Sequence, residues 1–317
     1  MSPAPLPLPP PPRPAAAEAL ALGADDWLES DHATASLWWN PARVPPLADG
    51  RPGLVGHFWS DDPAGEAGVA LLEEACERLA RQDVQLAIGP MNGNTWRAHR
   101  LVIESDGRPP FAMEPRNPEV WVDCFRRAGF KMLAGYSSAV VDLTREAPDF
   151  AALERRLAGR GLRVRCLDPG DFEGELARIH ELSLVAFSGN YLYTPLALDE
   201  FVAAYSLVRA AVVPELVLLA ECEGRLQGFV FGLPDLEAGA AGREPALVVK
   251  TLAVRPEGGW RGLGSLLVHQ VQQRARGIGF TEAIHALQHE ANPSLRLGSR
   301  FDPRVFRRYA LFSRHLA

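Results

Sequence analysis

Residues 247–279 read LVVKTLAVRPEGGWRGLGSLLVHQVQQRARGIG, and this stretch decides the fold. It opens with the apolar runs Leu247–Val249 and Leu252–Val254, which predict a strand. The strand ends at a glycine-rich turn, and an amphipathic pattern typical of a helix begins at Gly262. A strand, a tight turn and a helix N-terminus in this order gather free backbone N–H groups and the positive end of a helix dipole at one place. The stretch therefore predicts a binding site for a phosphate group.

The glycines of this turn do not form either of two common phosphate loops. No Gly-Lys-Ser/Thr follows them, so the turn is not a Walker loop, and Leu267 stands where the dinucleotide fingerprint needs a third glycine. Gly262 and Gly264 still allow a bulky anion to approach the backbone closely. Arg261 adds a positive charge beside them.

The turn resembles the acyl-CoA motif of the GCN5-related N-acetyltransferase (GNAT) superfamily, which is Q/R-x-x-G-x-G/A after an apolar strand. Here the motif reads Gly259-Trp260-Arg261-Gly262-Leu263-Gly264, and the preceding Val254-Arg255-Pro256-Glu257 is similar to the strand ending of that family. Gly259 replaces the usual Gln or Arg, which removes one side-chain contact and leaves the backbone groups in place. The resemblance implies acetyl-CoA as co-substrate. The alternative is a turn that only joins a strand to a helix.

The composition is that of an ordinary globular protein with two domains. The chain has 317 residues, 47% of them hydrophobic, and a net charge of −6, so we expect no nucleic-acid partner. No apolar run reaches the roughly 18–20 residues of a membrane span and nothing at the N-terminus resembles a signal peptide, so we expect no membrane partner and a cytoplasmic location. The four cysteines have no CxxC spacing and are interpreted as reduced core residues: Cys76, Cys124, Cys166 and Cys222.

Three segments are expected along the chain. Residues 1–16 form a proline-rich tail that we expect to be disordered, because proline cannot take part in helices or sheet ladders. Residues 17–147 and 148–317 are expected to form two α/β (α+β) domains. Under the resemblance these are tandem GNAT-like domains, each with a central mixed β-sheet flanked by helices.

An internal repeat supports the tandem arrangement. A shift that places Gly68 on Gly264 superimposes the helix expected at 65–81 on the helix of the opening stretch. The turn before it, residues 60–66, carries three carboxylates and no arginine. Carboxylates stabilise a helix N-terminus and repel a pyrophosphate, so we predict that this copy is degenerate and does not bind CoA. The segment 89–94 either resembles one found in some tandem family members or is a turn that ends a strand.

The predicted elements of the second half follow the family order β-α-α-β-β-β-α-β-α-β. Its expected strands are 162–167, 216–222, 226–233, 247–254, 281–287 and 304–314, and its expected helices are 172–187, 198–212 and 262–279, with a short helix opened by residue 292. In the first half we expect helices at 65–81 and 120–128 and strands at 35–39, 54–59, 84–90 and 137–143, with a linking helix at 150–157.

The resemblance also implies which residues hold the cofactor. Backbone groups at the end of the motif strand would bind the pantetheine arm, and the pyrophosphate would lie on the turn that follows. The turn Asn292-Pro293-Ser294 resembles a second family motif, in which the asparagine contacts the pantetheine, although an asparagine before proline is also a good helix cap. The implied cofactor-binding residues are Leu252, Ala253, Val254, Arg261, Gly262, Leu263, Gly264, Ser265, Asn292 and Ser294.

Catalytic groups are harder to assign. The family often places a tyrosine seven residues after the asparagine as the acid for the thiolate, and Ser299 stands there. A serine is a much weaker acid, so Ser299 only hydrogen-bonds, or Tyr309 replaces it, or there is no dedicated acid. Glu221 is the most plausible general base. Lys250, on the motif strand, is a poor base unless burial lowers its pKa strongly.

Two further groups of side chains complete the candidate site. His285 and Glu290 are other candidate bases. His285 and His289, with Glu290, could also suggest a metal, but no further protein ligand is evident and we expect no metal. Tyr191 and Tyr193 lie in the loop that borders the acceptor pocket in this family, or they only pack that loop.

The expected function is N-acetyl transfer from acetyl-CoA to an amine of a small molecule or peptide, by direct attack in a ternary complex. The alternative is a catalytically weak, CoA-binding or regulatory protein whose first copy binds a partner or ligand. The sequence leaves the oligomeric state open, and a homodimer is one alternative.

Overall fold

The computed structural model describes residues 11–44, 46–47, 50–240, 242, 245–291 and 299–316. The chain forms two compact units. The first unit takes the chain up to Pro109, residues Glu114–Tyr136 and the chain end from Arg307, and the second takes Pro110–Met113 and Ser137–Phe306. Most of the proline-rich tail lies outside the described residues.

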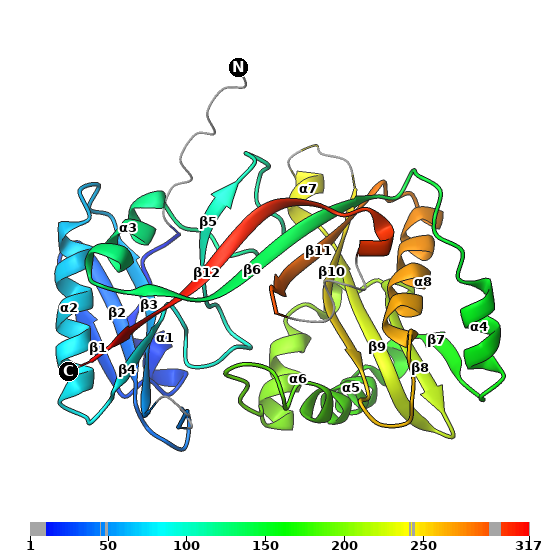
Figure 1. The fold of residues 1–317 in the computed structure, drawn as a ribbon, viewed down its shortest axis with the longest axis horizontal. Coiled ribbons are helices and arrows are strands. Elements are labelled where there is room, and N and C mark those ends of the chain that lie inside the picture. Colours follow the sequence, from blue (N-terminus) through cyan, green and yellow to red (C-terminus); the bar gives the residue numbers. More distant parts are fainter. Residues whose placement is uncertain are drawn as a thin grey trace. The chain divides into compact units, whose positions relative to one another are not determined.

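The first unit contains a sheet covered by two helices (Figure 1). Its amphipathic helix α2 buries one face, which carries the apolar residues that predicted a helix here. Its strands are β1 (Asp26–Glu29), β2 (Ala33–Trp38), β3 (Pro52–Ser60), β4 (Leu86–Gly89) and β5 (Leu101–Ser105), and its helices are α1 (Ala16–Ala21), α2 (Glu66–Ala80) and α3 (Glu119–Arg127). Strands β1, β2, β3 and β4 are neighbours in that order, and β3 and β4 run parallel.

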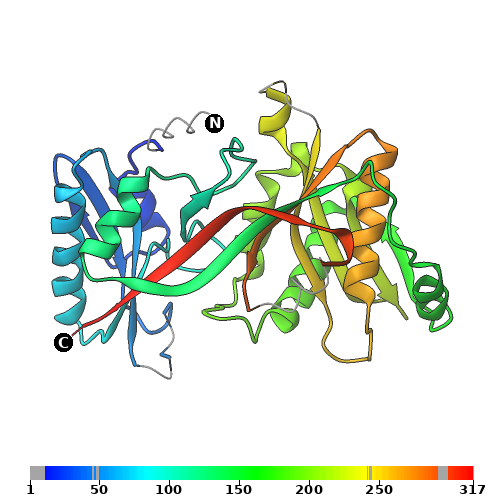
Figure 2. The ribbon, with the colours of Figure 1, turned by 45° about the horizontal axis from the view of Figure 1, so that its top comes forward.

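Between residues 163 and 289 the elements of the second unit follow the predicted order, with one additional short helix, α7, that was not predicted (Figure 2). The helix expected at residue 292 lies outside the described residues, and most of the last predicted strand belongs to the first unit. Its strands are β7 (Arg163–Cys166), β8 (Val217–Cys222), β9 (Arg225–Pro234), β10 (Ala246–Val254) and β11 (Glu282–His289), and its helices are α4 (Ala151–Ala158), α5 (Phe172–Ala186), α6 (Leu198–Ser206), α7 (Leu236–Ala240) and α8 (Leu263–Gly277). The strands lie in the order β7-β8-β9-β10-β11, and β10 and β11 are parallel. The predicted α/β class with a mixed sheet flanked by helices is confirmed.

The boundaries of the two units differ from the expected boundaries of segments 17–147 and 148–317, because two long strands contribute to both units. Strand β6 (Lys131–Asp142) enters the second unit from Ser137 onward and lies beside β11 there. Strand β12 (Arg304–His315) belongs to the first unit from Arg307 onward, where it pairs with β4 and β5. Each unit therefore needs a strand from the other half of the sequence.

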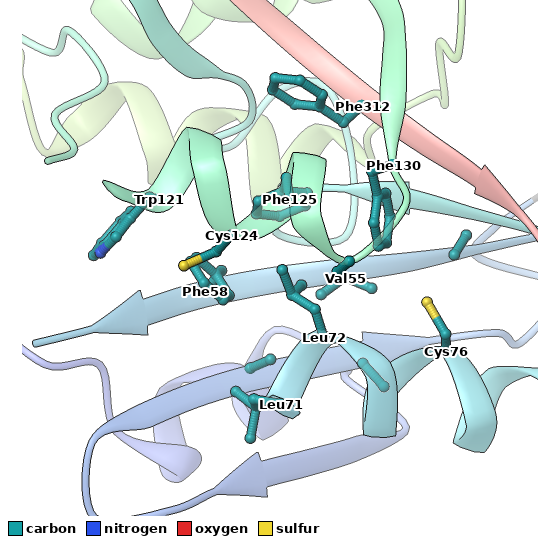
Figure 3. Close-up of a cluster of buried hydrophobic side chains, with 14 of the residues drawn as sticks. Val55, Phe58, Leu71, Leu72, Cys76, Trp121, Cys124, Phe125, Phe130 and Phe312 are labelled. Carbon is teal, nitrogen blue, oxygen red and sulfur yellow. The ribbon is translucent and has the colours of Figure 1, made fainter. Parts of the chain in front are cut away.

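The core of the first unit shows this exchange directly (Figure 3). Phe312 of β12 packs against Phe125 of α3 with ring centroids 5.6 Å apart, and Phe125 also contacts Phe58 of β3. At Gly68 a side chain would meet Cys124 Sγ at 2.7 Å, so the glycine of α2 that aligns with Gly264 is required by helix packing.

Alternate residues of β9 place helices on both faces of the second sheet. Val230 belongs to the core formed with α8, whereas Phe231 contacts Tyr205 of α6 with ring centroids 5.1 Å apart. One face therefore carries α8 and the other carries α6. Within the described residues, no helix is both long and apolar enough to cross a bilayer.

Candidate functional site

The site forms where the parallel strands β10 and β11 part. Their pairing covers Ala246–Val249 and ends with Val249 opposite His285. Strand β10 continues to Val254 and pairs there with β9, after a bulge at Lys250. The predicted pantetheine residues Leu252, Ala253 and Val254 therefore lie on a segment that pairs with β9 on one edge, and no described strand is registered on its other edge.

The turn after β10 is shaped by glycines. Gly258, Gly259 and Gly262 have φ of 86°, 66° and 90°, which glycine adopts at little cost. At Gly258 a Cβ would lie 2.7 Å from Trp260 Nε1, so that position also needs glycine for space. The Trp260 indole donates to Gln227 Oε1 of β9 at 2.8 Å and fixes the turn to the sheet.

Backbone N–H groups of this turn point to no acceptor. Within the described chain, hydrogen bonds are absent for the N–H groups of Gly259, Trp260, Arg261, Gly262, Gly264 and Ser265. Helix α8 starts within this run, at Leu263. The positive end of its dipole therefore lies beside these N–H groups and also favours an anion. The structure thus brings the predicted pyrophosphate residues together at one helix N-terminus.

Arg255 holds the junction between strand and turn, a role that its place in the motif did not reveal. Its side chain is 3% exposed, donates from Nε to Leu226 O at 3.2 Å, and donates from Nη2 to Glu181 Oε1 at 3.1 Å. Its own N–H donates to Gln227 O at 2.8 Å. Arg255 therefore ties the end of β10 to β9 and α5.

Lys250 is the titratable side chain at the bulge. It reaches solvent, and its ammonium lies 4.8 Å from the centre of the Tyr205 ring of α6. The protein around this ammonium displaces water, which lowers the pKa of Lys250. A lowered pKa is the direction of change that a lysine needs in order to act as a base.

Glu221 lies elsewhere. Its carboxylate accepts from Arg165 Nη2 at 2.5 Å, and Arg165 also binds Glu175, which is 1% exposed. Arg178 adds a further contact to Glu175. Arg165 occupies this carboxylate, so Glu221 belongs to a structural ion cluster between β7, β8 and α5, and we do not retain it as the base.

The candidate acid Tyr309 is a packed core residue. Tyr309 lies on β12 in the first unit, is fully buried, and donates from its hydroxyl to Glu114. Because its hydroxyl already bonds a carboxylate, we do not retain Tyr309 as the acid. Ser299 begins a short 3-10 helix, and only the backbone of Ser299 itself is described; Asn292 and Ser294 lie outside the described residues.

The two loop tyrosines differ in exposure. Tyr191 is 42% exposed, whereas Tyr193 packs edge-on against Phe187 at 6.4 Å, and burial raises its pKa. His180 of α5 contacts Leu196 O at 2.7 Å and holds the end of this loop. The loop borders α5 and α6, and a role in acceptor binding stays a prediction.

His285 is a packed residue. Its ring is 4% exposed and lies 2.8 Å from Gln272 Nε2 of α8, on the face opposite α6. Burial lowers the pKa of His285 to about 4. Within the part of the chain that the structure describes, no group of three or more His, Cys, Asp or Glu residues could hold a metal.

This buried histidine predicts an acid-sensitive fold. An unfolded chain protonates His285 near pH 6.5 and the folded chain only near pH 4, so stability should fall as pH drops between these values, by up to about 1.4 kcal/mol per pH unit. His285→Gln should reduce this dependence in urea unfolding followed between pH 7 and pH 4.5, and the part due to the buried His99, whose pKa is also lowered by burial, should remain. His315→Gln, at an exposed position, should leave it unchanged, and an equal slope in all three proteins would contradict the assignment.

The comparisons with known proteins agree with this geometry. Residues 176–298 match the model of the acetyltransferase (GNAT) family. The chain therefore contains a GNAT domain. Its GNAT fold resembles a GCN5-related N-acetyltransferase from Sphaerobacter thermophilus, with a TM-score of 0.52 and 15% identity over 90% of this chain and 77% of that one.

A second solved structure has the tandem arrangement. It is a tandem GNAT protein from the clavulanic acid biosynthesis pathway, with a TM-score of 0.51 and 13% identity over 97% of this chain and 90% of that one. At these identities the likeness concerns the fold. Among curated proteins, this chain is 24% identical to protein YghO of Escherichia coli over 192 residues, which are 59% of this chain and 49% of YghO. The chain thus spans about half the length of that relative.

The first GNAT-like unit closes the corresponding positions with its own side chains. Asp62 accepts from the N–H groups of Ala64 and Ala67 at the start of α2, and these backbone bonds lower its pKa. Where β3 and β4 part, the His57 N–H donates to Asn92 Oδ1 at 2.7 Å. The carboxylate at the helix N-terminus was predicted, whereas the insertion of the 89–94 segment between the strands was not.

Proposed function

We propose that the second unit binds acetyl-CoA and transfers its acetyl group to an amine of a small molecule or peptide. The observation that carries this proposal is the set of N–H groups of residues 259–262, 264 and 265 at the start of α8, which form no hydrogen bond within the described chain and follow the segment of β10 that pairs only with β9 there. GNAT membership supports acyl transfer in general. The identity of the acyl donor and the amine acceptor belongs to the proposal.

The chain supplies two binding surfaces for this donor. When bound, acetyl-CoA supplies a thioester whose carbonyl carbon accepts the amine. Backbone groups of Leu252–Val254 orient the pantetheine arm along the open edge of β10. The turn and the α8 dipole hold the pyrophosphate, with Arg261 as an exposed cation beside it.

Lys250 is the proposed proton acceptor. The attacking amine forms the new C–N bond and loses one proton to the neutral Lys250 amine, while the C–S bond breaks and the thiol sulfur leaves with its electron pair. A lowered pKa increases the neutral fraction of Lys250 at a given pH, which a base requires. No side chain of the described residues is assigned as the acid for the sulfur.

Lys250→Met should therefore lower kcat by about 100-fold and leave acetyl-CoA affinity unchanged. In the parent, the rate should rise with pH to a plateau reached below the usual lysine pKa, since the neutral amine is the active form. The variant should lose this limb in a pH–rate profile. The chain's other lysine offers the control, and Lys131→Met should behave as the parent. An unaltered pH profile in Lys250→Met would exclude Lys250 as the base.

One observation favours a second candidate, a CoA-binding regulatory protein. Glu221 is held by Arg165 and Tyr309 lies in the first unit, so two predicted catalytic groups are engaged elsewhere. A thiol-release assay with acetyl-CoA and a panel of amines, combined with titration of acetyl-CoA, separates the two. Binding with amine-dependent thiol release supports the enzyme, binding alone supports the regulator, and no binding rejects both.

A further inference from the structure

The first position of the acyl-CoA motif is a glycine and therefore carries no side chain. An arginine from outside the motif lies beside this position. Gly259 occupies that position, and a Cβ built on it would lie 3.9 Å from Arg160 Nη1. Arg160 comes from the turn after α4, about a hundred residues earlier in the chain. Its guanidinium also lies 4.3 Å from the centre of the Trp260 ring.

Two arginines bind the carbonyl side of the turn. Arg160 donates from Nη1 to Gly259 O and from Nη2 to Gly258 O, each at 2.7 Å. Arg156 of α4 donates from Nη2 to Arg261 O at 2.6 Å. Charged donors make these hydrogen bonds strong, and the planar guanidinium of Arg160 fits two consecutive carbonyls at once.

Holding these carbonyls also fixes the N–H groups. In a planar trans peptide the C=O of one residue and the N–H of the next point in opposite directions. Because the carbonyls of residues 258, 259 and 261 face the arginines, the N–H groups of Gly259, Trp260 and Gly262 face away from them. These N–H groups are among those that form no hydrogen bond within the described chain.

Helix α4 is itself fixed on α8. Gln270 donates to Glu154 Oε1 at 2.8 Å, and the Phe150 ring stacks on His269 at 4.6 Å. The Leu153 side chain lies next to Gly262, within 3.0 Å of where a Cβ would be. The arginines therefore come from a support that is packed along the phosphate-binding helix.

We propose that Arg156 and Arg160 are positioning residues of the acyl-CoA site, which aim the N–H groups of the turn at the pyrophosphate and replace the side chain lost at Gly259. This inference rests on the proposed function, because it assigns the turn to acetyl-CoA. It concerns the pyrophosphate and neither the pantetheine arm nor the 3′-phosphate of the ligand.

A ligand series tests the proposal. Arg160→Ala should weaken binding of CoA and of 3′-dephospho-CoA to the full chain equally, by about 10- to 100-fold, the usual effect of losing hydrogen bonds from a charged group. It should not change binding or turnover of S-acetylpantetheine, which has no pyrophosphate. Arg160→Lys should recover only part of the affinity, since a lysine cannot bridge two carbonyls with a rigid fork. Arg155→Ala, which changes an exposed arginine of α4, is the matched control and should bind as the parent does.

The other outcomes overturn the proposal in distinguishable ways. If Arg160→Ala binds CoA as the parent does, the positioning role is wrong. If Arg160→Ala weakens binding of CoA but not of 3′-dephospho-CoA, Arg160 contacts the 3′-phosphate directly instead. If Arg160→Ala also weakens binding of S-acetylpantetheine, the substitution damages the site in general. If the parent itself binds no CoA, the proposed function fails before this inference is reached.

Discussion

Gly264→Val should abolish acetyl-CoA binding, weakening it by at least about 100-fold. Gly264 is a buried residue in the first turn of α8, and its N–H is among those left without an acceptor. A β-branched side chain there would fill the space in which the pyrophosphate must approach the backbone. Isothermal titration of the full chain with acetyl-CoA measures the loss.

The matched control lies at the other end of the same helix. A Cβ on Gly277 meets nothing within 4 Å, so Gly277→Val should keep both stability and acetyl-CoA affinity. Gly68 is unsuitable as a control because a side chain there meets Cys124 Sγ at 2.7 Å. Thermal unfolding of both variants separates lost binding from lost folding. Parent-like affinity in a folded Gly264→Val protein would contradict the proposed site.

A fragment cut at the boundary expected from the sequence, residues 148–317, should fail to fold. It lacks the part of β6 that lies beside β11, including Val140 and Val141 of the second core. It retains the part of β12 that belongs to the first unit, which would expose Phe312 and Tyr309. Loss of a core strand together with exposure of a buried one predicts aggregation or a non-cooperative transition.

A fragment of residues 137–306 provides the comparison, because it keeps the continuous part of the second unit. We expect cooperative unfolding by circular dichroism and acetyl-CoA binding from this fragment. A folded, acetyl-CoA-binding 148–317 fragment would show that the strand exchange is unimportant for the second unit.

The local patterns were readable from the sequence. The strand, turn and helix of residues 247–279 appear as β10 and α8 because apolar spacing and glycines act over a few residues. The same reason explains why α2 and α5 were predicted within a residue or two. The carboxylate that occupies the first helix N-terminus, Asp62, was also predicted from its position before the helix.

The remaining features depend on contacts between distant segments. An alternating strand pattern does not say which other strands the strand will pair with. The exchange of β6 and β12 and the position of Tyr309 were therefore not predictable. Glu221 was correctly placed on a strand, but its pairing with Arg165 comes from a neighbouring strand. Arg160 approaches Gly259 only because α4 packs on α8. These contacts decide the chemistry of the site.

The stoichiometry of acetyl-CoA binding tests the central claim most directly. The second unit offers unpaired N–H groups beside an open strand edge, whereas the first fills the matching positions with Asp62 and Asn92. Isothermal titration of the full chain should therefore give one acetyl-CoA per chain. A value of zero or two would contradict the assignment of an acetyl-CoA site to the second unit alone.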